Sequence, residues 1–237
     1  KALQQETDIS VRNNGSTYLA SNELEHQLLK EMQAIYTDQG YDAQLLTQAA
    51  CKARLPQVQT DYCVGGLLFP QEITIEPRQM IHRVIEHLTQ TYGLEYRPLT
   101  TIKDCEIRNN VCELRDARGV RYTAPKAVVC SGRDFKILFP EVFSQSGIRL
   151  CKLHMMATEP MPEVQMPGSI LTGLSIRHYE SFQCCPSFEQ LKNAPYHNDE
   201  LRKYGIHILF KQRADGAIII GDSHEYVSVD QSETLDF

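Results

Sequence analysis

Two segments in the second half of the chain hold residue types that can bind or protonate a substrate. Arg177, His178 and Tyr179 are adjacent. An arginine can bind a carboxylate through two hydrogen bonds, and tyrosine or histidine can orient a substrate or exchange a proton with it. The same three side chains could equally form the solvated face of a strand. His207 stands in the otherwise apolar run Gly-Ile-His-Ile-Leu-Phe, so its ring faces a cavity or water, or is a structural histidine whose hydrogen bonds are satisfied.

Two further segments have a spacing of interest. Residues 128–132 (Val-Val-Cys-Ser-Gly) predict a buried strand that ends in small residues. Glycine lets a ligand approach backbone N–H groups closely, although an ordinary strand and turn has the same pattern. Asp222, Ser223 and His224 are the residue types of a hydrolase triad. Triad members converge from separate elements, so near neighbours in sequence do not form one.

Composition excludes several classes of protein. The chain has 237 residues, about one and a half domains by length, with 42% hydrophobic and 23% charged residues, which is ordinary globular usage. Its net charge of −6 (24 Lys and Arg against 30 Asp and Glu) argues against binding to nucleic acid. No apolar run approaches the roughly 20 residues that span a bilayer. No G-x-G-x-x-G follows a strand, and there is no P-loop.

The eight cysteines indicate a reducing compartment. Several lie in apolar, strand-like runs, among them Cys130 and Cys151, and buried free thiols behave as small hydrophobic side chains. There is no C-x-x-C, and the adjacent Cys184 and Cys185 are poorly placed to chelate one zinc ion. We therefore expect reduced, structural cysteines, no metal site and a cytoplasmic protein.

Helical spacing and turn residues predict the elements that position these segments. Helices are expected from Asn22 to about Gly40, over 44–54, and over 77–92 with Pro77 first and Gly93 as the C-terminal cap. A β-meander is expected over 101–107, 111–116 and 120–124, with Asn109-Asn110 at its first turn. Further strands are expected over 127–130, 149–158, 169–174 and 175–183, and a hairpin over 206–212 and 217–220. The residues alone thus predict a soluble α+β protein.

Several segments together resemble the D-amino-acid oxidase and glycine oxidase family, in that family's order. Residues 15–20 (Gly-Ser-Thr-Tyr-Leu-Ala) and the acidic helix after them resemble the start of its substrate domain. Residues 65–70 (Gly-Gly-Leu-Leu-Phe-Pro) and 75–78 (Ile-Glu-Pro-Arg) are similar to the segment that returns to the flavin domain. Residues 122–132 resemble the strand and turn beside the cofactor, and residues 215–223 resemble the late hairpin of the substrate domain.

The resemblance implies a division of the chain into two parts. A mixed, mostly antiparallel substrate-domain sheet with flanking helices would be built from residues 1–72 and 141–237. A partial FAD-binding domain, made of a helix, the β-meander and the buried strand, would occupy residues 73–140.

The resemblance also implies the chemistry. Such enzymes use FAD to oxidise an amine or amino acid by hydride transfer, with O₂ or another acceptor reoxidising the flavin, and the protein supplies orientation and electrostatics. Cys130, Ser131 and Gly132 would then lie near FAD, and the backbone of Leu99 would face its adenine end.

The resemblance places one wall of the substrate site on strands of the later sheet. Arg177, Tyr179 and His207 are the expected substrate-binding residues, and no catalytic residue is identified. Leu209 stands where the family has an aromatic active-site residue, so that role is in doubt here.

The chain departs from the family at both ends. It lacks the opening G-x-G-x-x-G strand and stops soon after Glu225-Tyr226, and it starts without Met. We therefore expect an internal fragment that holds FAD weakly, because the pyrophosphate-binding helix start is missing. FAD and enzymatic activity are expected of the full-length parent, with a small amine or amino acid as substrate. The alternative is a non-catalytic ligand-binding or interaction module that keeps a flavoenzyme-like sheet.

Overall fold

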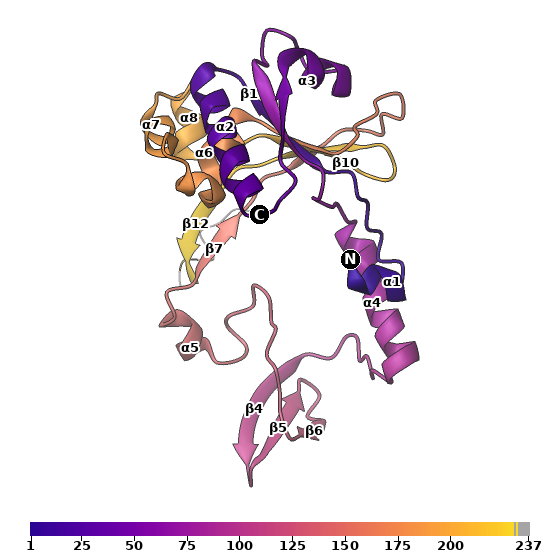
Figure 1. Cartoon of the computed structure of the whole chain (residues 1–237). Coiled ribbons are helices and arrows are strands. Elements are labelled where there is room, and N and C mark those ends of the chain that lie inside the picture. The colour runs from indigo at the N-terminus through magenta and orange to yellow at the C-terminus, as the bar shows by residue number, and fades with distance from the viewer. Residues whose placement is uncertain (230, 232–237) are drawn as a thin grey trace. The chain divides into compact units, whose positions relative to one another are not determined.

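The computed structural model describes residues 1–229 and 231, which fall into two compact units (Figure 1). The first unit comprises Lys1–Thr91 and Leu153–His224, and the second comprises Tyr92–Lys152 and Glu225–Phe237. Residues 92–152 of the second unit are therefore inserted between the two segments of the first, and its remaining residues follow the first unit in sequence. No helix of the described chain is both long enough and apolar enough to cross a membrane.

A mixed, mostly antiparallel sheet of seven strands forms the centre of the first unit. Its order is β2-β3-β1-β9-β10-β11-β8. Only β1 and β9 pair in parallel, and the other neighbours are antiparallel. The strands are β1 (Ser16–Ala20), β2 (Gln44–Thr47), β3 (Gly65–Phe69), β8 (Met156–Ala157), β9 (Ser169–Leu171), β10 (Leu209–Gln212) and β11 (Ile218–Gly221). This architecture confirms the predicted fold class.

Helix α2 (Glu23–Asp38) covers one face of this sheet. It begins where predicted, because the Asn22 side chain accepts a hydrogen bond from the backbone N of Glu25 at 3.0 Å. Its buried face includes Leu28, Leu29 and Met32. The remaining helices of this part of the chain are α1 (Ala2–Glu6), α3 (Gln48–Arg54), α4 (Pro77–Tyr92), α6 (Gly173–His178), the 3₁₀ helix η1 (Glu180–Cys184), α7 (Phe188–Asn193) and α8 (Asp199–Lys203).

Two hydrophobic clusters lie on opposite faces of the sheet. Tyr18 of β1 and Leu171 of β9 pack with α2, α6 and α7 on one face. Leu19 and Ile170, their neighbours in sequence, pack with Cys51 and other residues around α3 on the other face. This alternation is the period of two that a strand imposes on its side chains.

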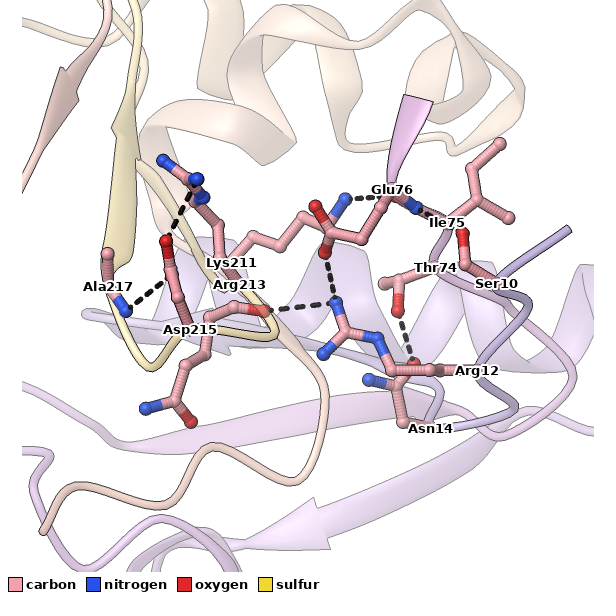
Figure 2. A network of polar contacts seen from close by, with 11 residues as sticks. Ser10, Arg12, Asn14, Thr74, Ile75, Glu76, Lys211, Arg213, Asp215 and Ala217 are labelled. Atoms are coloured by element: carbon pink, nitrogen blue, oxygen red, sulfur yellow. Dashed lines mark hydrogen bonds and ion pairs between the residues drawn. The ribbon is translucent and has the colours of Figure 1, made fainter. Parts of the chain in front are cut away.

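A polar network ties the start of the chain to β10 (Figure 2). The Arg12 guanidinium lies 2.8 Å from the Glu76 carboxylate and donates to the Gln212 carbonyl at 3.1 Å. Lys211 donates from Nζ to the Ile75 carbonyl at 2.6 Å. Burial lowers the pKa of Lys211, and the positive charge of Arg12 adds to this effect while Glu76 opposes it. These contacts hold the far end of β10, the strand that follows His207.

The second unit is built from short, separate elements. The predicted meander is present as β4 (Ile102–Arg108), β5 (Val111–Asp116) and β6 (Arg121–Ala124). Asn109 and Asn110 make its first turn with φ of 49° and 63°, a conformation that asparagine tolerates better than most residues. The other elements are α5 (Pro140–Ser144) and an antiparallel pair of strands, β7 (Arg149–Lys152) and β12 (Glu225–Ser228).

The expected strand over 175–183 is wrong. Residues 173–178 form α6 and residues 180–184 form η1, with the helical hydrogen bonds Ile176 N to Thr172 O (3.2 Å) and Tyr179 N to Ser175 O (3.0 Å). Ser175 and Ile176 are both fully buried although they are adjacent. A strand would have turned one of them to each face, so burial of both favours the helix.

The expected buried strand over 127–130 is also wrong. Its residues form no strand, and Val128 is 86% exposed. Among the described strands none pairs with this segment, so its backbone has no ladder to join. Cys130 and Cys151, expected to be buried, are exposed. All eight cysteines are free thiols.

Three predicted elements have different bounds. The helix expected over 44–54 begins only at Gln48, because residues 44–47 join the sheet as β2 and the Thr47 side chain caps the helix. The strand expected over 149–158 is divided into β7 and β8, which belong to different units. The strand expected over 169–174 ends at Leu171, before α6.

Candidate functional site

Three histidines converge beside the β10–β11 hairpin of the first unit. His178 ends α6, His207 precedes β10, and His224 follows β11. The rings of His178 and His207 stack with centroids 4.3 Å apart, and His224 lies 4.4 Å from His178 and 5.1 Å from His207. The hairpin therefore unites three motifs that are separate in the sequence.

His207 is the buried centre of this cluster. It is only 2% exposed, and its Nδ1 lies 3.1 Å from Oγ of Ser175. Its backbone N donates to the Asp222 carbonyl at 3.1 Å, and the backbone N of Asp222 donates back at 2.7 Å. Burial lowers the pKa of His207 to about 4, and the charges of His178 and His224 add to this shift. At neutral pH the ring is therefore uncharged.

Asp222 places a carboxylate against the same ring. Its Oδ1 lies 2.9 Å from Nε2 of His207, and the Asp222 side chain is 10% exposed. This oxygen makes no hydrogen bond to the described residues, so the ring N–H is not aligned with it. A neutral His207 has one ring proton to share between Ser175 and Asp222. The arrangement can hold or move a proton.

Ser175, His207 and Asp222 have the composition of a hydrolytic triad but not its accessibility. Ser175 is fully buried, and its Oγ also lies 3.1 Å from the carbonyl of Ile208. A nucleophilic serine needs a substrate carbonyl within reach, and this hydroxyl has no open side. The three residues therefore lock α6 onto the hairpin.

Two of the three expected substrate-binding residues lie in or beside the histidine cluster. Tyr179 packs against His207 with ring centroids 5.2 Å apart. Arg177 points elsewhere: it donates to the carbonyl of Ala194 at 2.9 Å and lies over the Tyr196 ring at 4.3 Å. Leu209 is half-buried in the hydrophobic cluster on the α2 face.

The three histidines also have the spacing of a possible metal site. One ring nitrogen from each lies within 4.8 Å of the others. His207 already contacts Ser175 and Asp222 through its two nitrogens, and its ring stacks on His178. A metal ion bound by all three would displace one of these contacts. The expected absence of a metal site stays a prediction.

An apolar cavity of about 500 Å³ lies on the sheet face opposite α2. Leu19, Ile170, Phe210 and Ile218 line its floor, one from each of four strands. Tyr62 lies at its wall, and no charged side chain lines it. Its size is typical of a small-molecule site, and its lining suits a flat apolar group.

A profile of FAD-dependent oxidoreductases matches residues 1–236. The chain belongs to this family. No curated protein sequence matches it.

Solved structures with the same fold agree with membership of the family. Glycine oxidase from Geobacillus kaustophilus is 14% identical with a TM-score of 0.63, over 96% of this chain and 52% of that chain. L-proline dehydrogenase from P. horikoshii is 16% identical with a TM-score of 0.70, over 95% of this chain and 52% of that one. The amino acid oxidase NikD is 14% identical with a TM-score of 0.65, over 99% and 55%. The chain thus spans about half the length of these structures.

The expected cofactor residues all lie in the second unit and have the exposure that a cofactor surface requires. Leu99 is 94% exposed with φ of 57°, and its carbonyl accepts a hydrogen bond from Arg118 at 3.2 Å. Gly132 has φ of 60°, and no atom lies within 4 Å of where a Cβ would stand. Cys130 and Ser131 are exposed. The role of these residues at FAD stays a prediction, and the sequence contains no pyrophosphate-binding fingerprint.

Sequence reasoning missed Ser175 as a partner of His207 and treated the Asp222 segment only as a rejected triad. One signal was present in the sequence. His207 lies at the start of the first strand of the predicted hairpin (206–212), and Asp222 follows its second strand (217–220). Pairing His207 with Asp222 across that hairpin would have brought the carboxylate to the ring. The contact with Ser175 depends on helix α6, where the sequence analysis expected a strand.

Proposed function

We propose that the parent of this chain is an FAD-dependent oxidoreductase that oxidises an amine or amino acid by hydride transfer to flavin. The family match over residues 1–236 carries the proposal. Solved structures with this fold include a glycine oxidase and an L-proline dehydrogenase, both of which act on amino acids. FAD would supply the electron acceptor, and the chain would supply binding and proton handling.

The two parts of the chain would have different roles. Residues 1–72 and 141–237 would form the substrate-binding domain, and residues 73–140 would contribute part of the FAD-binding domain. Exposed backbone at Leu99 and over 130–132 supports a flanking position along the cofactor. The isolated chain would hold FAD weakly, because no fingerprint for the pyrophosphate is present in it.

The histidine cluster supports one wall of the substrate site. Tyr179 would face the substrate side, and the buried His207, held between Ser175 and Asp222, would support the Tyr179 ring from behind. An amine must lose a proton before its hydride can leave, and His207, buried with a pKa of about 4, is too weak and too enclosed to accept that proton itself. Arg177 would bind a substrate carboxylate only after leaving the carbonyl of Ala194.

The test is the visible absorption spectrum of the full-length protein purified without denaturation. We expect the bands of oxidised flavin, and we expect them to bleach when an amine or amino acid is added without oxygen. A colourless protein that neither retains nor takes up FAD would contradict the proposal. If the protein holds FAD but no amine or amino acid reduces it, the proposed substrate class is wrong and the proposed cofactor stands.

A further inference from the structure

A second cavity, of about 570 Å³, lies on the α2 face of the first unit and differs from the apolar one by its aromatic lining. Five aromatic rings line it, with one carboxylate and no basic side chain among the lining residues. Its lining residues are Tyr18, Met32, Tyr36, Gly40, Tyr41, Phe69, Gln71, Glu72, Ser181 and Phe182.

The five rings form a continuous chain of nearly perpendicular contacts. Phe182 and Tyr18 meet at 68°, Tyr18 and Phe69 at 86°, Phe69 and Tyr36 at 81°, and Tyr36 and Tyr41 at 79°. Successive centroids are 5.3–5.9 Å apart. These are edge-to-face contacts, in which one ring presents its edge to the face of the next. The rings that also line the cavity offer it aromatic surface, to which a cation is attracted when it lies over a ring face.

The tyrosine hydroxyls of this cavity have no protein partner. Tyr18 is only 8% exposed, yet its hydroxyl makes no hydrogen bond to any described residue. The same holds for Tyr36 and Tyr41 within the described chain. Burial raises the pKa of Tyr18, and the charge of Glu72 raises it further, so the phenol stays protonated. None of these three hydroxyls is a buried polar atom without a partner, so each is open to the cavity or to solvent and available to a ligand.

Glu72 is the one charged residue that lines this cavity, and its carboxylate makes the lining negative. Its backbone is fixed on both sides, because Glu72 N donates to the Phe69 carbonyl at 3.3 Å and Gly15 N donates to the Glu72 carbonyl at 3.1 Å. Its carboxylate forms no ion pair with a described residue, and its charge acts on both Tyr18 and Tyr36. An unpaired carboxylate at an aromatic cavity favours a cation over an anion or a neutral molecule.

We propose that this cavity binds a small alkylammonium ion, held by the rings of Tyr18, Tyr36 and Tyr41 and by the carboxylate of Glu72. An alkylated ammonium suits it better than a bare one, since the alkyl groups fill an apolar space while the charge meets ring faces. The site lies wholly in the first unit and needs no flavin. It is therefore independent of the proposed oxidation and is tested without it.

The test measures binding of choline to the whole 237-residue chain by calorimetry, beside 3,3-dimethylbutan-1-ol. This alcohol has the shape of choline with a carbon in place of the charged nitrogen. We expect choline to bind about ten-fold more tightly than the alcohol. Equal affinity would overturn the proposal, because the cavity would then recognise shape alone. Absence of choline binding would overturn it as well.

Two variants test the named residues. Glu72→Gln should weaken choline about five-fold and leave the alcohol unaffected, whereas Glu163→Gln, an exposed carboxylate that does not line the cavity, should change neither. Tyr41 is 52% exposed, so Tyr41→Leu should fold normally and weaken choline more than the alcohol. Thermal unfolding of each variant checks the fold. Choline affinity unchanged by both Glu72→Gln and Tyr41→Leu, in folded protein, would overturn the assignment of the site.

Discussion

The two units of the chain bury their apolar residues very differently. In the first unit both faces of the sheet carry hydrophobic clusters, and side chains such as Leu29, Leu67 and Ile176 are fully buried. Between residues 92 and 152 the buried side chains belong to Asp116 and Lys152, which are polar. A domain needs an apolar core to offset the entropy of folding. The first unit has such a core, whereas in the described part of the second unit the one buried apolar side chain is that of Val229.

The second unit instead exposes apolar side chains over its length. Leu99, Ile107, Val128 and Val142 are each more than half exposed. Large exposed apolar surfaces mark places where another surface docks. This contrast is what the proposed place of residues 73–140 in a larger cofactor-binding body predicts for residues 92–140, and the following predictions test it.

The largest expected effect comes from comparing two leucine-to-alanine substitutions, one in each unit. Leu29 is fully buried in α2, whereas Leu99 is exposed. Leu29→Ala should lower the free energy of unfolding by about 2–5 kcal/mol, because it leaves a cavity in the core. Leu99→Ala should change it by less than about 0.5 kcal/mol. Urea unfolding followed by circular dichroism measures both, and comparable losses would remove the contrast between the units.

The next effect is a pH dependence located in the first unit. His207 has a pKa of about 4 when folded, against an ordinary value near 6.5. Between these values the unfolded chain binds a proton that the folded chain does not, so stability falls as the pH falls. We expect a loss of about 2 kcal/mol from pH 7 to pH 5.

A matched pair of histidine variants isolates this contribution. His207→Asn should flatten the dependence of the unfolding free energy on pH, whereas His82→Asn, at an exposed histidine of α4, should leave the slope unchanged. The slope is the readout, so a general loss of stability in His207→Asn does not disturb the comparison. An unchanged slope in His207→Asn would mean that the ring is not held neutral in the folded protein.

The smallest effects concern one asparagine in each unit. Asn22→Ala removes the cap of α2 and should lower the unfolding free energy by about 1 kcal/mol. Asn110 has φ of 63° in the meander turn, so Asn110→Gly should stabilise the meander by about 0.5 kcal/mol or less. Amide exchange rates of α2 and of β4 and β5 report each change separately. A slower exchange of α2 in Asn22→Ala would contradict its role as the cap.

Local patterns predicted the elements whose stability is mainly local. The capping residue Asn22, the first-position Pro77 of α4 and the turn residues Asn109 and Asn110 all act over a few positions, and the elements they mark are present. The prediction for residues 175–183 failed because Ile176, Tyr179 and Phe182 recur at every third position, which is a helical spacing and not the alternation of a strand. Residues 127–130 failed because an apolar run indicates burial only where another strand is available to pair with it.

The candidate site was predictable only in part. His207, His178 and Tyr179 were selected by residue type, and the structure brings them together. Arg177 was selected in the same way, but its guanidinium binds the carbonyl of Ala194. Whether a side chain turns toward a site depends on the helix or strand that carries it. The pairing of Ser175 with His207 joins positions 32 residues apart, and no local pattern encodes it.

The most direct test of the central claim is hydrogen exchange over residues 126–132 of the full-length protein, measured with and without FAD. Strand β1, buried at every position, serves as the internal reference. If the second unit lies along the cofactor, FAD should slow exchange over 126–132 at least about ten-fold and leave β1 unchanged. Unchanged exchange over 126–132 at saturating FAD would contradict the assignment of this unit to the cofactor side.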